Sequence, residues 1–215
     1  MPGASRIYVL AGVNGAGKSS IGGEIFRASG GDYFNPDEVA RELAAQRPEL
    51  ALAEANAEAW QIGRGQLERA IREHLDYAFE TTLGGNTIQR LLAEAARKGI
   101  EIFVWYVGLT TPELHIDRVA ARVRRGGHPI PEEKIRERYV RSRLNLIRLL
   151  PLLTQLRMYD NSADAEPDAG RAPALKLVLH WKAGSILGPK DLAPTPEWAK
   201  PIVAAALECA SVKKG

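Results

Sequence analysis

Residues 12–19 read Gly-Val-Asn-Gly-Ala-Gly-Lys-Ser, a glycine-rich segment that ends in a lysine and a serine. Glycines at this spacing let a loop curl so that its backbone N–H groups point inward and bind phosphate oxygens. The lysine adds a point charge for the β- and γ-phosphates, and the serine hydroxyl is a ligand for Mg²⁺. The segment fits the Walker A pattern at every fixed position and predicts a site for ATP with Mg²⁺, the metal ligand being Ser19. The residues expected to bind the nucleotide here are Gly12, Asn14, Gly15, Ala16, Gly17, Lys18, Ser19 and Ser20.

A carboxylate follows the second short apolar segment, in the run Phe34-Asn35-Pro36-Asp37-Glu38. Opposite a γ-phosphate, the Asp37 carboxylate accepts the proton of an attacking hydroxyl and orients that hydroxyl in line. Acidic residues are also favoured in the first turn of any helix, so the local sequence leaves both interpretations open. The position after a second strand, downstream of a phosphate loop, favours the catalytic one.

Nine arginines fall between residues 118 and 148. Arg118, Arg122 and Arg125 are spaced i, i+4, i+7 and are expected to share one helical face. Gly126-Gly127 follow as a hinge, which predicts a mobile lid that brings guanidinium groups over the transferring phosphoryl group. The alternative is a solvated helix with Asp117 as a salt-bridge partner. Some of the later arginines, Arg136, Arg138, Arg141 and Arg143, are expected to be structural and to pair with Glu132, Glu133 and Glu137.

The elements that position these groups alternate between strand and helix. Apolar runs predict strands over 7–11, 33–34, 76–80, 100–107 and 156–159, and a terminal β-hairpin over 175–181 and 184–187. Helices are predicted over 18–28, from 36 onward, and over 50–74, 87–98, 111–125, 131–150 and 196–210, with bends at Gly63 and Gly65 in the third. The pattern predicts one α/β domain over 1–215, a parallel P-loop NTPase sheet of the nucleotide-kinase type flanked by helices, with an arginine-rich helical lid over about 111–150.

The polar residues that end the predicted strands are expected to meet at the carboxyl edge of the sheet, where ligands bind in such folds. They are Asn14, Asp37, Glu80 and Asn161. Asn161 and Ser162 end the fifth strand, near the place where P-loop kinases hold adenine, and are expected to bind the nucleotide.

The amino-acid composition indicates the general class of the protein and its cellular compartment. The chain is 45% hydrophobic and 26% charged with a net charge of +3, as in an ordinary globular protein. The single cysteine, Cys209, permits no internal disulfide and favours a reducing compartment, and no signal sequence is visible, so a cytoplasmic location is expected. The sequence contains no run of about 18 apolar residues, so no contact with a membrane is expected.

The rest of the sequence narrows the class of P-loop protein. Motor and transporter ATPases carry a strand that ends in a pair of acids, whereas Tyr77-Ala78-Phe79-Glu80 ends in one acid followed by threonines. The guanine-reading run Asn-Lys-x-Asp of GTPases is absent from the sequence. The remaining class, and the one that explains Asp37, is a kinase for a small molecule that bears a hydroxyl group.

Several segments together resemble the zeta-toxin kinases, and more closely their compact chromosomal relatives, over roughly residues 6–190. These segments are the Walker A loop, Asn35-Pro36-Asp37-Glu38, Glu80-Thr81-Thr82, the stretch 118–131 with Gly126-Gly127-His128, and Tyr159-Asp160-Asn161-Ser162. Zeta toxins phosphorylate the 3′-hydroxyl of UDP-N-acetylglucosamine. The resemblance therefore implies such an acceptor or a related sugar nucleotide, and an antitoxin protein as a candidate partner.

Carried over by position, the resemblance implies roles for individual residues. Lys18 and Ser19 match the phosphate and Mg²⁺ positions, Asp37 matches the catalytic base, and Arg118 matches the first lid arginine. Arg122 and Arg125 both qualify as the second. The implied substrate residues are Asn35, Arg41, Glu80, Thr81, Thr82 and His128. The Gly-Gly-His-Pro turn departs from the best-known members, and Arg41 is only the nearest candidate for an arginine that they carry after the aspartate.

Two alternatives to a sugar-nucleotide kinase remain. One is a kinase for another hydroxyl, on a nucleoside, a cofactor or an antibiotic. The other is an NTPase or end-kinase linked to nucleic acid, with the arginine helices contacting the phosphate backbone. Binding of single strands uses aromatic side chains interleaved with the basic ones, and Tyr139 alone lies among these arginines, so nucleic acid is not expected as a partner.

Overall fold

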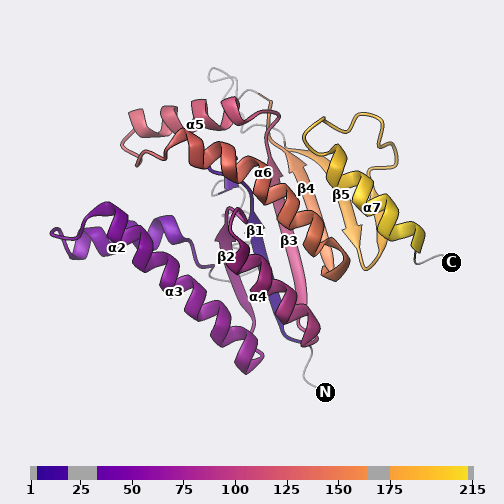
Figure 1. The fold of residues 1–215 in the computed structure, drawn as a ribbon, viewed down its shortest axis with the longest axis horizontal. Coiled ribbons are helices and arrows are strands. Elements are labelled where there is room, and N and C mark those ends of the chain that lie inside the picture. The colour runs from indigo at the N-terminus through magenta and orange to yellow at the C-terminus, as the bar shows by residue number, and fades with distance from the viewer. Residues whose placement is uncertain (1–3, 19–32, 164–174, 213–215) are drawn as a thin grey trace.

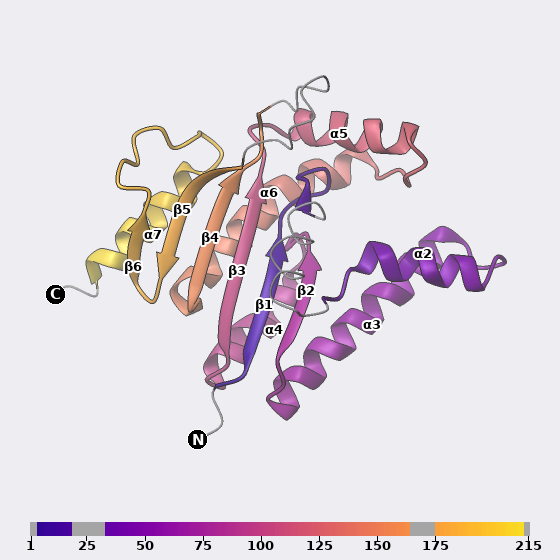
Figure 2. The same cartoon turned by 180° about the vertical axis from the view of Figure 1, so that it is seen from behind.

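The computed structural model describes residues 4–18, 33–163 and 175–212, and Figures 1 and 2 present them from two sides. The helix expected over 18–28 lies outside the described residues apart from its first residue. In chain order the elements are β1 (Arg6–Ala11), α2 (Pro36–Gln46), α3 (Leu52–Glu73), β2 (Tyr77–Thr81), α4 (Asn86–Arg97), β3 (Glu101–Gly108), α5 (Pro112–Arg124), α6 (Glu132–Leu149), the 3₁₀ turn η1 (Leu150–Leu152), β4 (Gln155–Asp160), β5 (Lys176–Lys182), β6 (Ser185–Gly188) and α7 (Lys200–Val212).

The strands form one six-stranded sheet in the order β2-β1-β3-β4-β5-β6. The first four strands are parallel, whereas β5 and β6 pair antiparallel at the far edge as the expected hairpin. The predicted α/β fold with a mostly parallel sheet is therefore confirmed. In Figure 2 the arrowheads of β1, β3 and β4 point toward α5, so their carboxyl ends meet at one edge below that helix.

The strand predicted at 33–34 is reduced to one bridged residue beside β2. Phe34 bridges Phe79, with hydrogen bonds from Phe34 N to Ala78 O (2.9 Å) and from Glu80 N to Phe34 O (2.9 Å). The strand stops there because the next residue caps α2: the side chain of Asn35 accepts a hydrogen bond from Asp37 N at 3.0 Å. This cap fixes the first turn of α2 at the carboxyl edge of β2.

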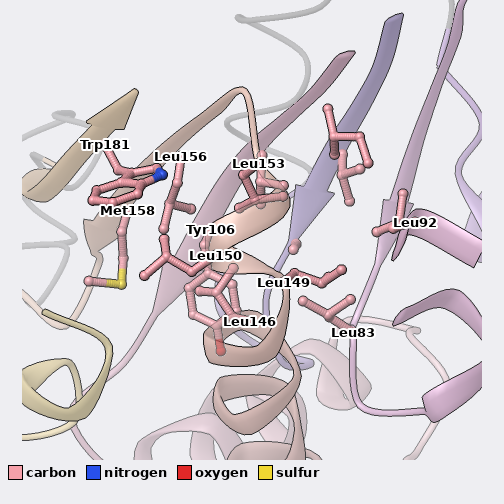
Figure 3. Packing of buried hydrophobic residues seen from close by; sticks show 14 of the residues in the cluster. Leu83, Leu92, Tyr106, Leu146, Leu149, Leu150, Leu153, Leu156, Met158 and Trp181 are labelled. Carbon is pink, nitrogen blue, oxygen red and sulfur yellow. The ribbon is translucent and has the colours of Figure 1, made fainter. Parts of the chain in front are cut away.

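Among the described helices, α4, α6 and α7 cover one face of the sheet (Figures 1 and 2). In Figure 3 the side chains of Leu146 and Leu149 on α6 lie toward Tyr106 on β3, and all belong to the large buried cluster of the molecule. The last helix begins at residue 200 rather than at 196, because a separate turn precedes it in which Ala199 N bonds Pro196 O at 2.9 Å. No helix in the described ranges is both long and apolar enough to cross a membrane.

Helices α2 and α3 form a hairpin beside the β2 edge and pack on each other through a small cluster of their own. Its buried members are three alanines, Ala40, Ala55 and Ala59. Helix α3 runs unbroken from 52 to 73 through both glycines at which a bend was predicted. Gly63 instead lets Phe34 approach, because a Cβ there would lie 2.4 Å from Phe34 Cε1, whereas a Cβ at Gly65 would meet nothing within 4 Å.

The two glycines of α3 therefore predict opposite effects for the same substitution. Gly65→Ala should raise the free energy of unfolding by about 0.5–1 kcal/mol, because alanine loses less backbone entropy in a helix. Gly63→Ala should lower it by about 1–3 kcal/mol, because the added methyl overpacks against the Phe34 ring. Chemical denaturation of both variants measures the difference, and equal effects at the two positions would contradict the assigned contact.

Candidate active site

The phosphate loop between β1 and Lys18 is enclosed from three sides. Its three glycines have φ values of 146°, 81° and 88°, in the range that side chains disfavour. A Cβ on each would also lie 2.3–2.6 Å from an atom of another segment, which leaves no room for a side chain. The contacts join Gly12 to Val107 O of β3, Gly15 to His115 O of α5, and Gly17 to Asn161 Nδ2 after β4.

Asn161 supports the loop directly. Its side-chain amide donates to Ala16 O at 2.8 Å, and its backbone N–H donates to Gly108 O at 3.0 Å. The hydroxyl of Ser162 accepts from Thr110 N at 2.8 Å and is also bonded to Asp160. Both residues thus hold the carboxyl ends of β3 and β4 against the loop, and their expected contact with adenine stays a prediction.

His115 on α5 is joined to the loop by a buried hydrogen bond. Its Nδ1 lies 2.8 Å from Asn14 O, and because a carbonyl can only accept, Nδ1 carries the hydrogen and donates it. The side chain is 1% exposed. Burial lowers the pKa of His115 to about 4, partly offset by the bond to Asn14. The imidazole is therefore neutral near pH 7. His115 was not among the site residues predicted from the sequence.

Lys18 and Glu80 form a buried ion pair at the base of the loop. Lys18 Nζ lies 3.4 Å from Glu80 Oε1 and 3.4 Å from Val13 O, with the two side chains 6% and 10% exposed. Burial raises the pKa of Glu80 above the usual carboxyl range, the Lys18 charge lowers it again in part, and nearby Asp37 adds to the rise. Glu80 thus lies at the carboxyl end of β2 beside the lysine, as its position in the sequence predicted.

The three arginines that were expected to share one face of the lid helix make different contacts. Arg122 Nη1 lies 3.5 Å from Asp37 Oδ2, and its Nη2 donates to His128 O at 3.3 Å, so this residue links the catalytic candidate to the turn after α5. Arg118 lies beside Gly15 and donates to Ala163 O at 3.3 Å. Arg125 is an exposed C-cap residue that donates to Ala121 O at 3.3 Å, away from the cavity described below.

Arg138 on α6 reaches the phosphate loop, which the sequence analysis missed. Its Nη1 donates to Asn14 Oδ1 at 2.8 Å, and Gly84 makes room for it, because a Cβ there would lie 2.7 Å from Arg138 Cγ. Burial lowers the pKa of Arg138, while Asp37 and Glu137 partly restore it. A charged, poorly solvated guanidinium therefore faces both the loop and the Asp37 carboxylate.

Two other arginines of α6 form ion pairs. Arg141 pairs with the expected Glu137 at 3.1 Å. Arg136 lies 4.0 Å from the expected Glu132, but its shorter contact, at 2.5 Å, is with Glu113, which was not predicted. These acids keep the two guanidinium groups in surface pairs. Nothing in the sequence distinguished Arg138 from them, since all three lie within one turn and a half of helix.

Helix α6 is fixed to the segment after β2 by two buried polar side chains. Ser142 Oγ donates to Thr82 O at 2.7 Å, and Asn145 Nδ2 donates to Leu83 O and Gly85 O at 3.0 and 3.3 Å. The hydroxyls of Thr81 and Thr82 accept from Leu83 N and Gly84 N within the same turn, at 3.0 and 3.4 Å. These hydrogen bonds hold the segment after β2 against the middle of α6.

A cavity of about 610 Å³ opens between the α2–α3 hairpin, the end of β2 and the start of α6. Its wall includes Lys18 and Asp37, so the phosphate loop and the catalytic candidate face the same space. Of the predicted substrate residues, the wall contains Asn35, Glu80, Thr81, Thr82 and His128. The sixth, Arg41, is exposed on α2, donates to Asp37 O at 3.2 Å and is not part of this wall. Ser19 and Ser20 lie outside the described residues.

The sequence matches a known protein family over residues 7–142, the family described as AAA domain. The chain belongs to this family. A protein of Haemophilus influenzae described only as uncharacterized is 32% identical to this AAA domain protein over 139 residues, which cover 63% of this chain and 93% of the relative.

Solved structures share the fold of this AAA domain protein at low sequence identity. The AvrRxo1-ORF1:AvrRxo1-ORF2 complex with ATP has a TM-score of 0.65 at 16% identity, over 95% of this chain and 64% of that chain. The PezAT chromosomal toxin-antitoxin system of Streptococcus pneumoniae gives 0.54 at 15%, over 99% and 88%. At these identities the likeness establishes the fold, a P-loop kinase-like α/β domain.

The buried His115 predicts a specific dependence of stability on pH for this AAA domain protein. Between pH 6.5 and about 4 the unfolded chain binds a proton at His115 that the folded protein excludes. The contribution of His115 to the free energy of unfolding should therefore be complete above pH 6.5. As the pH drops to 4, this residue alone should lower the free energy of unfolding by about 3 kcal/mol. Urea unfolding at pH 7 and pH 4 should show this loss reduced in His115→Asn.

The control is His74→Asn, because His74 is exposed at the left-handed C-cap of α3 with φ 53°, where asparagine is well tolerated. It should keep the pH dependence of the original protein. A His115→Asn variant with that same pH dependence would contradict the buried, neutral assignment.

Proposed function

We propose that this protein is an ATP-dependent kinase that transfers the γ-phosphate to a hydroxyl group of a small molecule. One observation carries the proposal: Asp37 and Lys18 line the same 610 Å³ cavity. An ATPase that only hydrolyses its nucleotide needs room for a water molecule, whereas this volume is in the range of sites for small organic ligands. A cavity that joins the phosphate loop to a carboxylate is what an acceptor needs.

In the proposed reaction the Asp37 carboxylate accepts the proton of the acceptor hydroxyl, whose oxygen attacks the γ-phosphorus as the bond to ADP breaks. Arg122, 3.5 Å from Asp37, orients the carboxylate. Lys18 would contact the phosphates, and Arg138, bonded to Asn14 of the loop, would stabilise the charge on the transferring group. Mg²⁺, held by the Ser19 hydroxyl, would neutralise phosphate charge when bound.

The acceptor that we propose is UDP-N-acetylglucosamine or a related sugar nucleotide. The support is the resemblance of the sequence to zeta-toxin kinases, together with the shared fold of the PezAT toxin-antitoxin system. Basic side chains of α6 in the cavity wall suit an anionic acceptor. An antitoxin is proposed as a partner on the same resemblance, and a cytoplasmic location is proposed because the single cysteine favours a reducing compartment.

Asp37→Asn should lose phosphoryl transfer by about 10²–10⁴-fold while ATP still binds, because the amide cannot take the proton. Phosphorylated product is measured by mass spectrometry after incubation of hydroxyl compounds, sugar nucleotides included, with MgATP. Arg125→Ala, exposed and outside the cavity wall, is the matched control and should keep its rate. Unchanged turnover in Asp37→Asn would exclude Asp37 as the general base. An enzyme that phosphorylates no acceptor, and whose ATP hydrolysis DNA or RNA stimulates, would overturn the kinase proposal.

Arg138→Lys should reduce kcat by about tenfold or more, because lysine keeps the charge but loses the planar fork that reaches both the loop and the phosphoryl group. Arg136→Lys, whose parent residue pairs with Glu113 on the surface, is the control on the same helix and should behave like the unmodified protein. Steady-state kinetics separate kcat from the KM for ATP. An equal loss in ATP affinity and in rate would make Arg138 a ground-state phosphate clamp instead.

A further inference from the structure

The cavity has one wall that the proposed phosphoryl transfer does not use. It is the face of α3 that carries Asn56, Trp60, Gly63 and Arg64. Trp60 is 40% exposed although it lines a cavity, whereas Trp181 and Trp198 are 1% and 3% exposed in the core. Folding alone gives no reason to leave a large aromatic ring partly bare at this place, because burial of such a ring is strongly favourable.

The contacts around α3 hold this wall in a fixed position. Phe34 packs against Gly63, and the hydroxyl of Tyr77 donates toward Gly63 O at 3.4 Å. These contacts hold the middle of α3 against β2 and against Phe34, which is bridged to β2. Arg64 lies over the Trp60 ring with Cζ 5.8 Å from the centroid, and its Nε donates to Glu68 at 2.8 Å. The Trp60 ring and the Arg64 guanidinium group are therefore in contact with each other before any ligand binds.

The charged side chains of the cavity indicate which kind of ligand group it would bind beside the α3 wall. Lys134, Arg138 and Arg141 of α6 line the same space with a single acid of that helix, Glu137. Glu137 lies 3.2 Å from Lys134 and 3.1 Å from Arg141, so one carboxylate is shared by two cations. Arg138 bonds the neutral amide of Asn14. This side of the cavity therefore carries excess positive charge, which favours a phosphate group.

We propose that the Trp60–Arg64 wall binds a flat, unsaturated heterocyclic ring of the acceptor, and that a phosphate group attached to this ring through its sugar lies against the cations of α6. The inference rests on the proposed kinase function, since it assigns the ring to the molecule that receives the phosphoryl group. Aromatic side chains and arginine both stack on nucleobases, and such stacking tolerates different bases. The class of ligand is therefore a nucleotide or nucleotide derivative, held at a site separate from the phosphate loop.

The test measures binding with the phosphate loop already occupied. Protein saturated with Mg²⁺ and a non-hydrolysable ATP analogue is titrated with UMP, with AMP and with ribose 5-phosphate in a calorimeter. Ribose 5-phosphate carries the sugar and the phosphate but no base. At least one nucleotide should bind about tenfold or more tightly than ribose 5-phosphate, since stacking on an aromatic side chain is worth a factor of about 5–150.

Three variants assign that preference to the wall. Trp60→Leu should abolish the preference for the nucleotide and leave binding near that of ribose 5-phosphate, whereas Trp60→Phe, which keeps an aromatic ring, should retain most of it. Ile62→Ala is the matched control, because Ile62 is 36% exposed on the same helix and does not line the cavity. It should bind the three probes like the unmodified protein.

The results separate this inference from the kinase proposal. Equal affinity for all three probes, or a nucleotide preference that survives in Trp60→Leu, would overturn the ring site even if some acceptor is phosphorylated. A preference that depends on Trp60, in a protein that phosphorylates no acceptor under any condition, would support the ring site and sink the kinase proposal instead.

Discussion

The close approach of three segments to the phosphate loop is the constraint on which the site depends. Gly12, Gly15 and Gly17 each leave space for only a hydrogen where another segment would meet a Cβ. The loop therefore cannot change shape without moving β3, α5 or the end of β4. Since α5 is bonded to the loop through His115, and α6 through Arg138, both helices are held to the same loop residue, Asn14.

Two ion pairs of different burial lie around the loop. Lys18 and Glu80 compensate each other in a poorly solvated place, where an unpaired charge would be costly. Arg122 and Asp37 pair at a more exposed position. The same pairs order long side chains that would otherwise lose rotamer freedom when the ligand binds, and this ordering lowers the cost of binding.

The parallel strands, the hairpin and the phosphate loop could be predicted from the sequence because their signals are local: apolar runs, glycines and caps. Asp37 and Glu80 could be found for the same reason, since Glu80 lies at the carboxyl end of β2 and Asp37 follows shortly after the bridged Phe34. Arg138 could not, because its partner Asn14 is 124 residues away and the contact depends on how α6 crosses the sheet. Periodicity also grouped Arg125 with Arg118, although α5 ends at Arg124 and the next residue turns away.

The first half of α3 packs on α2 through the alanine cluster, whereas its second half joins the large core through Leu67 and Ile71. Trp60 and Arg64 lie on the cavity face of α3 and belong to neither buried cluster. Substitutions at these two positions should therefore change the contacts of the acceptor more than the packing that holds the phosphate loop. A lineage built on this scaffold can diversify its substrates by changing one face of a single helix.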